Sequence, residues 1–343
     1  MKKAAHRPSR RLQPCRSGAG SARLLLASTL VGALLALLVS GCGGESAIAG
    51  SPEAGESAPR AGPESRPLRI TCTVGMLTDL VRQVGGDRVD ATGLMGPGTD
   101  PHLYKASPGD LKQLLASDLI IYCGHHLEGR MAEVFSRIAR QRPTVAVCER
   151  IEEEHLLTPE GSAGAVDPHL WFDVRNWMRV TEIVRETLSL HDPGGERSYR
   201  SRAARLLERL DELDGEVRAR IAEIPPGRRV LITAHDAFRY FGRAYGIEVL
   251  GIQGISTQSE AGVRRINELA ALIARREVRA VFVESTVSEK NVRSLIEGCG
   301  ALGHDLKIGG SLFSDAMGAE GTPEGTYIGM VRHNVNTIVE ALR

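Results

Sequence analysis

The tripeptide Asp-Pro-His occurs twice in this chain of 343 residues, at Asp100-Pro101-His102 and at Asp167-Pro168-His169. Proline fixes its own φ and pushes the preceding residue toward extended backbone, so each histidine stands on a stiffened loop. The neighbouring carboxylate is placed to accept the second ring N–H of an imidazole, as in many metal sites. A single loop of this kind is common without a ligand, but two in one chain favour a metal site.

Two further ligand-type side chains, His235 and Asp315, follow predicted strands in the second half of the chain. Open α/β sheets bind ligands beyond the carboxyl ends of their strands. Successive members of the set are 67, 66 and 80 residues apart, which is too far for a zinc finger. The sequence therefore predicts a tertiary metal site at a cleft between two lobes, with the ligands His102, His169, His235 and Asp315.

Short β-rich runs alternate with helical stretches in both halves of the chain. This pattern predicts an α/β fold with two lobes of parallel sheets covered by helices. In the first half we expect strands over residues 68–74, 88–94, 118–123 and 144–148 and helices over 77–84, 108–116 and 127–140. In the second half we expect strands over residues 229–233, 247–252, 279–284 and 305–308 and helices over 237–245, 260–276, 289–302 and 326–342.

Residues 196–224 are rich in helix formers and lie between glycine and proline breakers. They predict one long, rigid helix of roughly 29 residues, about 43 Å at 1.5 Å per residue, which joins the two lobes. A helix packed on one lobe alone is the alternative. The expected organisation is residues 1–41 as signal peptide, 42–67 as tether, 68–192 as N-terminal lobe, 193–227 as linking helix and 228–343 as C-terminal lobe.

The N-terminus has the pattern of an export signal. Seven basic residues and no acidic one precede an apolar run of sixteen residues, 24–39, which is shorter than the roughly 20 residues of a membrane span. Val39-Ser40-Gly41-Cys42 resembles the bacterial lipobox, so we expect Cys42 to become the lipidated first residue of a protein on the outer side of a membrane. An uncleaved anchor is the alternative.

The charge of the mature chain argues against a nucleic-acid partner. Removal of residues 1–41 takes seven basic and no acidic residues from totals of 43 and 42, which leaves a net charge of −6. A mature chain with a net negative charge and no basic surface is not expected to bind the phosphates of nucleic acid. The same charge does not repel a small cation. Residues 43–67 are dominated by Gly, Ser, Ala, Pro and Glu and read as a flexible tether.

Four segments together resemble the cluster A-I metal-binding receptors of ABC importers, most closely TroA-type proteins: GTDPHLYKASPGD, DPHLWFD, AHDAFRYFGRAYGIEVLGIQGISTQSEA and GGSLFSDAMG. The resemblance covers nearly all of residues 68–343. It implies two α/β lobes joined by a long helix, with metal ligands at His102, His169, His235 and Asp315. It also implies a receptor that delivers the ion to a membrane permease with a separate ATPase subunit. A receptor that docks on one permease is expected to be a monomer.

The imidazole-rich set favours Zn²⁺ as the transported ion, with Mn²⁺ as the alternative. The zinc-specialised branch of these receptors often carries a long loop rich in histidine and acid, of which Glu152-Glu153-Glu154-His155 is only a stub. Binding of the metal ion requires neutral imidazoles. We therefore expect the affinity for the ion to decrease when the pH is lowered below about 6.

The sequence leaves two other classes of protein as alternatives, a metal-dependent hydrolase and a surface adhesin. Catalytic zinc usually has three protein ligands and a water, and the sequence lacks His-Glu-x-x-His, Gly-x-Ser-x-Gly and phosphate-loop motifs. We therefore expect no catalytic residues and no catalytic cofactor. An adhesin would not need the four ligands.

Other polar residues near the motifs have structural interpretations. Asp100 and Asp167 are expected to orient the neighbouring imidazole or to stabilise its loop, with direct ligation as the alternative, and Glu284 is expected to line the cleft without binding the ion. His125 and His126 are expected to be structural or to lie behind the ligands. Whether the remaining cysteines form a disulfide is left open by the sequence, since none lies in a Cys-x-x-Cys pair: Cys72, Cys123, Cys148 and Cys299.

Overall fold

The computed structural model describes residues 66–159 and 164–343. The predicted signal peptide, Cys42 and nearly all of the tether lie outside the described residues. Within the described ranges, no helix is both long enough and apolar enough to span a membrane.

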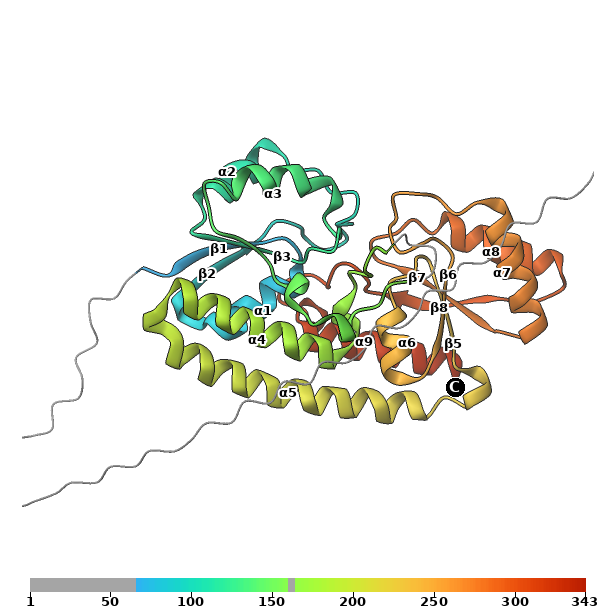
Figure 1. The fold of residues 1–343 in the computed structure, drawn as a ribbon. Coiled ribbons are helices and arrows are strands. Elements are labelled where there is room, and N and C mark those ends of the chain that lie inside the picture. The colour runs from blue at the N-terminus through green and yellow to red at the C-terminus, as the bar shows by residue number, and fades with distance from the viewer. Residues whose placement is uncertain (1–65, 160–163) are drawn as a thin grey trace, which may run out of the picture. The chain divides into compact units, whose positions relative to one another are not determined.

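The first half of the described chain forms a four-stranded parallel sheet with the order β2-β1-β3-β4. Figure 1 shows α2 and α3 over one face of this sheet and α1 and α4 over the other. The strands are β1 (Leu68–Cys72), β2 (Val89–Gly93), β3 (Leu119–Tyr122) and β4 (Thr144–Ala146), and the helices are α1 (Gly75–Gly85), α2 (Pro108–Ala116), α3 (Ala132–Ile138) and α4 (Val174–His191).

The second half contains two parallel strand pairs, β5 with β6 and β7 with β8, and β5 lies beside β7. Alternate residues of β5 enter different cores: Leu231 packs into one, and Val230 and Ile232 into the other. Both faces are therefore covered, and the predicted fold class is confirmed. The elements are β5 (Val230–Thr233), α6 (Arg239–Tyr245), β6 (Glu248–Gly251), α7 (Val263–Arg276), β7 (Ala280–Glu284), α8 (Lys290–Ala301), β8 (Lys307–Leu312) and α9 (Tyr327–Leu342).

The long helix predicted from the sequence is α5 (Glu196–Ala222), with 27 residues. It packs against α1 and α4 and also against α6 and α9, so it contacts elements from both halves of the chain. The boundaries of the lobes at residues 192 and 228 remain predictions.

Helix α4, which runs beside α5, was missing from the predicted elements. Its signals are nevertheless present in the sequence. The Asp173 side chain accepts the backbone N–H groups of Arg175 and Asn176 and caps the helix. Its buried apolar residues follow helical spacing: Trp177, Val180, Val184 and Leu188.

Two other predicted elements differ from the observed ones by four or more residues at one end, whereas the rest differ by at most three. The helix expected over 127–140 is reduced to a short 3-10 turn followed by α3. The last strand starts at Lys307 and continues to Leu312, four residues beyond its predicted end. Gly309 falls at a register shift between the strands, and a Cβ there would lie 2.9 Å from the Phe282 ring. The glycine that suggests a strand end is thus a close-packed bulge.

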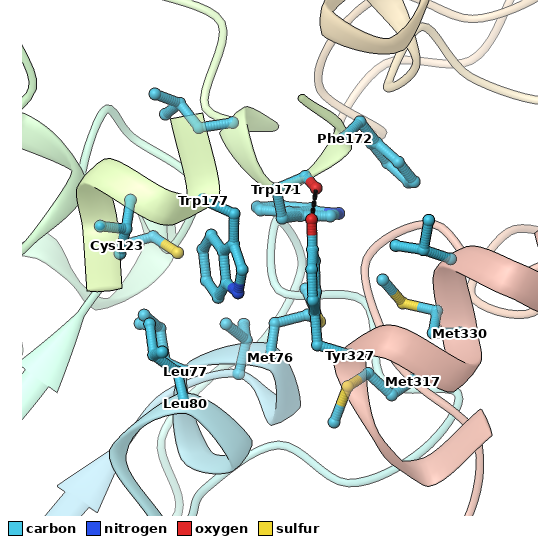
Figure 2. Close-up of a cluster of buried hydrophobic side chains, with 14 of the residues drawn as sticks. Met76, Leu77, Leu80, Cys123, Trp171, Phe172, Trp177, Met317, Tyr327 and Met330 are labelled. Carbon is cyan, nitrogen blue, oxygen red and sulfur yellow. Dashed lines mark hydrogen bonds between the residues drawn. The ribbon is translucent and has the colours of Figure 1, made fainter. Parts of the chain in front are cut away.

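A shared hydrophobic core joins the two halves of the chain. Figure 2 shows Trp177 of α4 and Tyr327 of α9 side by side, with Met76 of α1 nearby. The Trp177 and Tyr327 rings stack with centroids 5.2 Å apart, and the Tyr327 hydroxyl donates to the Trp171 carbonyl at 2.6 Å. A large rotation between the lobes would have to break this dense packing.

Candidate metal centre

Four side chains converge where the two halves meet. One potential ligand atom from each of His102, His169, His235 and Asp315 lies within 4.8 Å of all the others. Each of the four residues is at most 1% exposed. The site that the sequence predicts from distant residues is therefore assembled as a cluster by the fold.

The nitrogen Nε2 of each imidazole points toward the Asp315 carboxylate. The distance from Nε2 to the nearest Asp315 oxygen is 3.8 Å for His102, 3.4 Å for His169 and 3.3 Å for His235. The Nε2 atoms of His102 and His169 are 3.3 Å apart. Three nitrogens and a carboxylate thus face one small volume.

His169 and His235 are each held by a carboxylate on the opposite side of the ring. Asp167 lies 2.7 Å from Nδ1 of His169 and also accepts the backbone N–H of the same residue. Glu284, at the end of β7, lies 2.5 Å from Nδ1 of His235 and accepts its backbone N–H at 2.9 Å. Such pairs fix the tautomer and leave Nε2 free as the ligand atom.

His102 is held differently. Asp100 accepts the backbone N–H of His102 at 2.8 Å, so it orients the loop rather than the ring. Within the described part of the chain, Nδ1 of His102 has no hydrogen-bond partner. Both expectations agree with the geometry, since Asp167 orients the His169 imidazole and Asp100 stabilises the loop of His102.

Asp315 follows β8 and is anchored through its neighbour. The Ser314 carbonyl accepts the indole N–H of Trp171 at 3.0 Å, and the Ser314 hydroxyl lies 3.0 Å from that of Thr286. Both carboxylate oxygens of Asp315 are buried without a hydrogen-bond partner among the described residues. Buried polar atoms of this kind call for a partner such as an ion.

The charges of the cluster are strongly coupled. Burial lowers the pKa of His102 to about 3. Burial also opposes charge on His169, but Asp167 and Asp315 outweigh it and raise its pKa to about 9. The pKa of His235 is raised well above its usual range because Glu284 and Asp315 outweigh burial. The imidazoles of His235 and His169 in turn hold the pKa of Asp315 well below its usual range, despite burial.

This donor set fits a divalent transition ion. Three imidazole nitrogens and one carboxylate are the ligand types of zinc sites, and four protein donors leave no open position of the kind catalytic zinc uses. The arrangement can hold an ion without presenting it to a substrate.

Residues 70–341 match the model of a protein family described as zinc-uptake complex component A, periplasmic. The chain belongs to this zinc-uptake component family. The manganese-binding lipoprotein MntA of Bacillus subtilis is 44% identical over 305 residues, which cover 89% of this chain and 95% of MntA. The manganese ABC transporter substrate-binding lipoprotein PsaA of Streptococcus mitis is 27% identical over 281 residues, covering 80% and 89%.

The zinc-binding protein TroA of Treponema pallidum is 49% identical over 279 residues, covering 81% of this chain and 90% of TroA. The solved structure of the periplasmic zinc-binding protein TroA aligns with a TM-score of 0.78 at 48% identity, covering 80% of this chain and 99% of that one. The resemblance to TroA-type receptors is confirmed. As a member of the zinc-uptake component family, the chain is a metal ABC transporter substrate-binding protein and not an enzyme.

Other residues singled out from the sequence lie outside the cluster of four. Nε2 of His125 lies 3.0 Å from the Cys148 carbonyl, and both His125 and His126 have positive φ, at 48° and 62°. All four cysteines of the described residues are buried free thiols: Cys72, Cys123, Cys148 and Cys299. Thr257 and Gln258 were not among the predicted site residues, although their side chains reach the His102 loop from the C-terminal half of the chain.

Proposed function

We propose that this chain captures a zinc ion with His102, His169, His235 and Asp315 and delivers it to an ABC permease driven by a separate ATPase subunit. The observation that carries the proposal is the closed set of four buried donors within 4.8 Å of one another. A site with four protein donors and no open position suits an ion that is bound and later released without chemical change. The transported ion is cargo, and no bond of a substrate is broken. We further propose that the receptor acts as a monomer.

Zinc is the ion that the donor types favour. Three imidazole nitrogens and one carboxylate match tetrahedral zinc coordination, and nitrogen-rich sites bind zinc more tightly than manganese. The carboxylates of Asp167 and Glu284 behind two of the rings increase the basicity of the ligating nitrogens.

Manganese is the second candidate, and the position of Asp315 favours it. Its two carboxylate oxygens face different imidazoles, Oδ1 toward His169 and Oδ2 toward His235. Both oxygens can therefore bind one ion, which would raise the number of donors to five and add the oxygen ligand that manganese prefers.

Competition calorimetry on the full-length metal-stripped protein in detergent separates the two ions. We expect zinc to displace manganese and manganese to leave bound zinc in place. If manganese binds as tightly as zinc, the receptor is a manganese or dual receptor. If neither ion binds, the proposed function is wrong.

Zinc affinity should rise from about pH 6 to about pH 9, and each bound ion should release protons. An imidazole must lose its proton from the ligating nitrogen before it binds a metal. Carboxylates raise the pKa of His169 to about 9 and that of His235 well above its usual range, so both rings keep their second proton to higher pH and zinc must compete with that proton. Calorimetry in buffers of different ionisation enthalpy counts the protons, and a binding enthalpy independent of the buffer would contradict this expectation.

We also propose that Cys42 is lipidated and anchors the receptor outside the cytoplasm, facing the periplasm or the cell exterior. The lipobox-like Val39–Cys42 segment and the lipoprotein names of MntA and PsaA support this proposal. Cys42→Ala should abolish acylation, because the thiol that carries the diacylglycerol is missing. Mass spectrometry of the mature N-terminus checks this, and an unmodified Cys42 in the wild type would contradict the anchor.

A further inference from the structure

Three of the four clustered side chains are fixed by buried contacts that do not depend on an ion. The Asp167 carbonyl accepts the Tyr240 hydroxyl at 2.9 Å, two residues before His169. His235 is tied to Glu284 by both its backbone and its ring. Ser314, next to Asp315, accepts the Trp171 indole N–H, and Trp171 belongs to the shared core of Figure 2.

The loop that carries His102 lacks such an anchor. Thr99 and Leu103 donate their backbone N–H groups to carbonyls within the same loop. Among the described residues, the hydrogen bonds that tie residues 96–103 to segments outside the cluster of four come from two residues only, Thr257 and Gln258. Both belong to the other half of the chain, in the segment between β6 and α7.

These two contacts bear directly on the position of His102. The Thr257 hydroxyl donates to Oδ2 of Asp100 at 2.6 Å, while Oδ1 of Asp100 accepts the backbone N–H of His102 at 2.8 Å. The Gln258 amide donates to the His102 carbonyl at 3.3 Å. One carboxylate thus links the C-terminal half to the backbone of a ligand.

A cavity of about 250 Å³ borders the same loop. Gly96, Pro97 and Thr99 form part of its wall, and Asp315 lines it as well. Gly98, with a φ of +71°, provides a turn that other residues rarely adopt. Outward movement of this loop would therefore connect the ion site with an existing cavity.

We propose that Thr257 is a positioning residue that holds His102 on the bound ion through Asp100, and that breaking this contact is the step that frees the ion. The inference rests on the proposed function, since it needs an ion at the cluster. His102 is then the ligand that leaves first, and the other three stay in place. Thr257 itself does not touch the ion.

The test measures zinc dissociation from full-length protein after addition of excess fluorescent chelator. Thr257→Val removes the hydroxyl at nearly constant volume and should speed dissociation on the order of tenfold, the scale of one hydrogen bond to a charged group. Thr257→Ser keeps the hydroxyl and should dissociate at the wild-type rate. Gln258→Ala should speed dissociation in the same direction.

A double-mutant cycle separates positioning from general destabilisation. In a His102→Ala background the contact has no ligand to hold, so adding Thr257→Val should change the rate less than about twofold. The same acceleration with and without His102, or a wild-type rate in Thr257→Val, would overturn the inference while leaving zinc binding intact. Failure of the wild type to bind zinc would instead overturn the proposed function. Unchanged thermal unfolding of ion-free Thr257→Val is the expected folding control.

Discussion

His235→Ala should weaken zinc binding at least about 100-fold. Zinc binding free energies of about 10–16 kcal/mol, shared among four donors, correspond to roughly 3 kcal/mol per donor and hence to about two orders of magnitude in affinity. His235 is buried two residues beyond β5 and has Nε2 only 3.3 Å from Asp315, so its truncation removes one of the four proposed donors. Calorimetry with zinc measures the loss.

The matched control is His333→Ala. His333 lies on α9, is partly exposed and is not one of the four clustered residues, so its removal should leave zinc affinity unchanged. Circular dichroism of ion-free His235→Ala should show a folded protein, because the cores on both faces of β5 remain. Wild-type affinity in His235→Ala would remove this residue from the site.

Glu284→Gln should weaken zinc binding by about 10-fold to 100-fold, although Glu284 is not a proposed ligand. Its carboxylate lies 2.5 Å from Nδ1 of His235 and raises the pKa of that imidazole. An amide keeps the size of the side chain but loses the charge that favours a basic Nε2. Calorimetry at constant pH measures this loss.

Glu128→Gln serves as the control for removing a buried carboxylate. Glu128 is 3% exposed and accepts hydrogen bonds from the Thr73 hydroxyl and the Cys123 backbone, with no imidazole among these partners. It should reduce thermal stability without changing zinc affinity. Equal losses of affinity in the two variants would mean that Glu284 acts through general stability rather than through His235.

The four clustered residues were predictable because their signals are local. Each Asp-Pro-His tripeptide stiffens its own loop, and His235 and Asp315 follow predicted strands, beyond whose carboxyl ends open α/β sheets bind ligands. The alternation of strands and helices likewise predicted both lobes. The bulge at Gly309 was not predictable, because its glycine reads as a strand end until Phe282 is placed against it.

The residues behind the ligands were harder to find because their partners are distant in sequence. Glu284 is 49 residues from His235 and meets it only because β5 and β7 are neighbours. Thr257 is 157 residues from Asp100, and a threonine in a polar loop carries no signal of its own. Helix α4 is different, since the Asp173 cap and the spacing of its apolar residues were available in the sequence.

A crystal of the protein grown with zinc and measured at the zinc absorption edge would test the central claim most directly. The account predicts one strong anomalous peak about 2.0–2.2 Å from Nε2 of His102, His169 and His235 and from an Asp315 oxygen. A zinc peak elsewhere, with these four side chains unliganded, would contradict it.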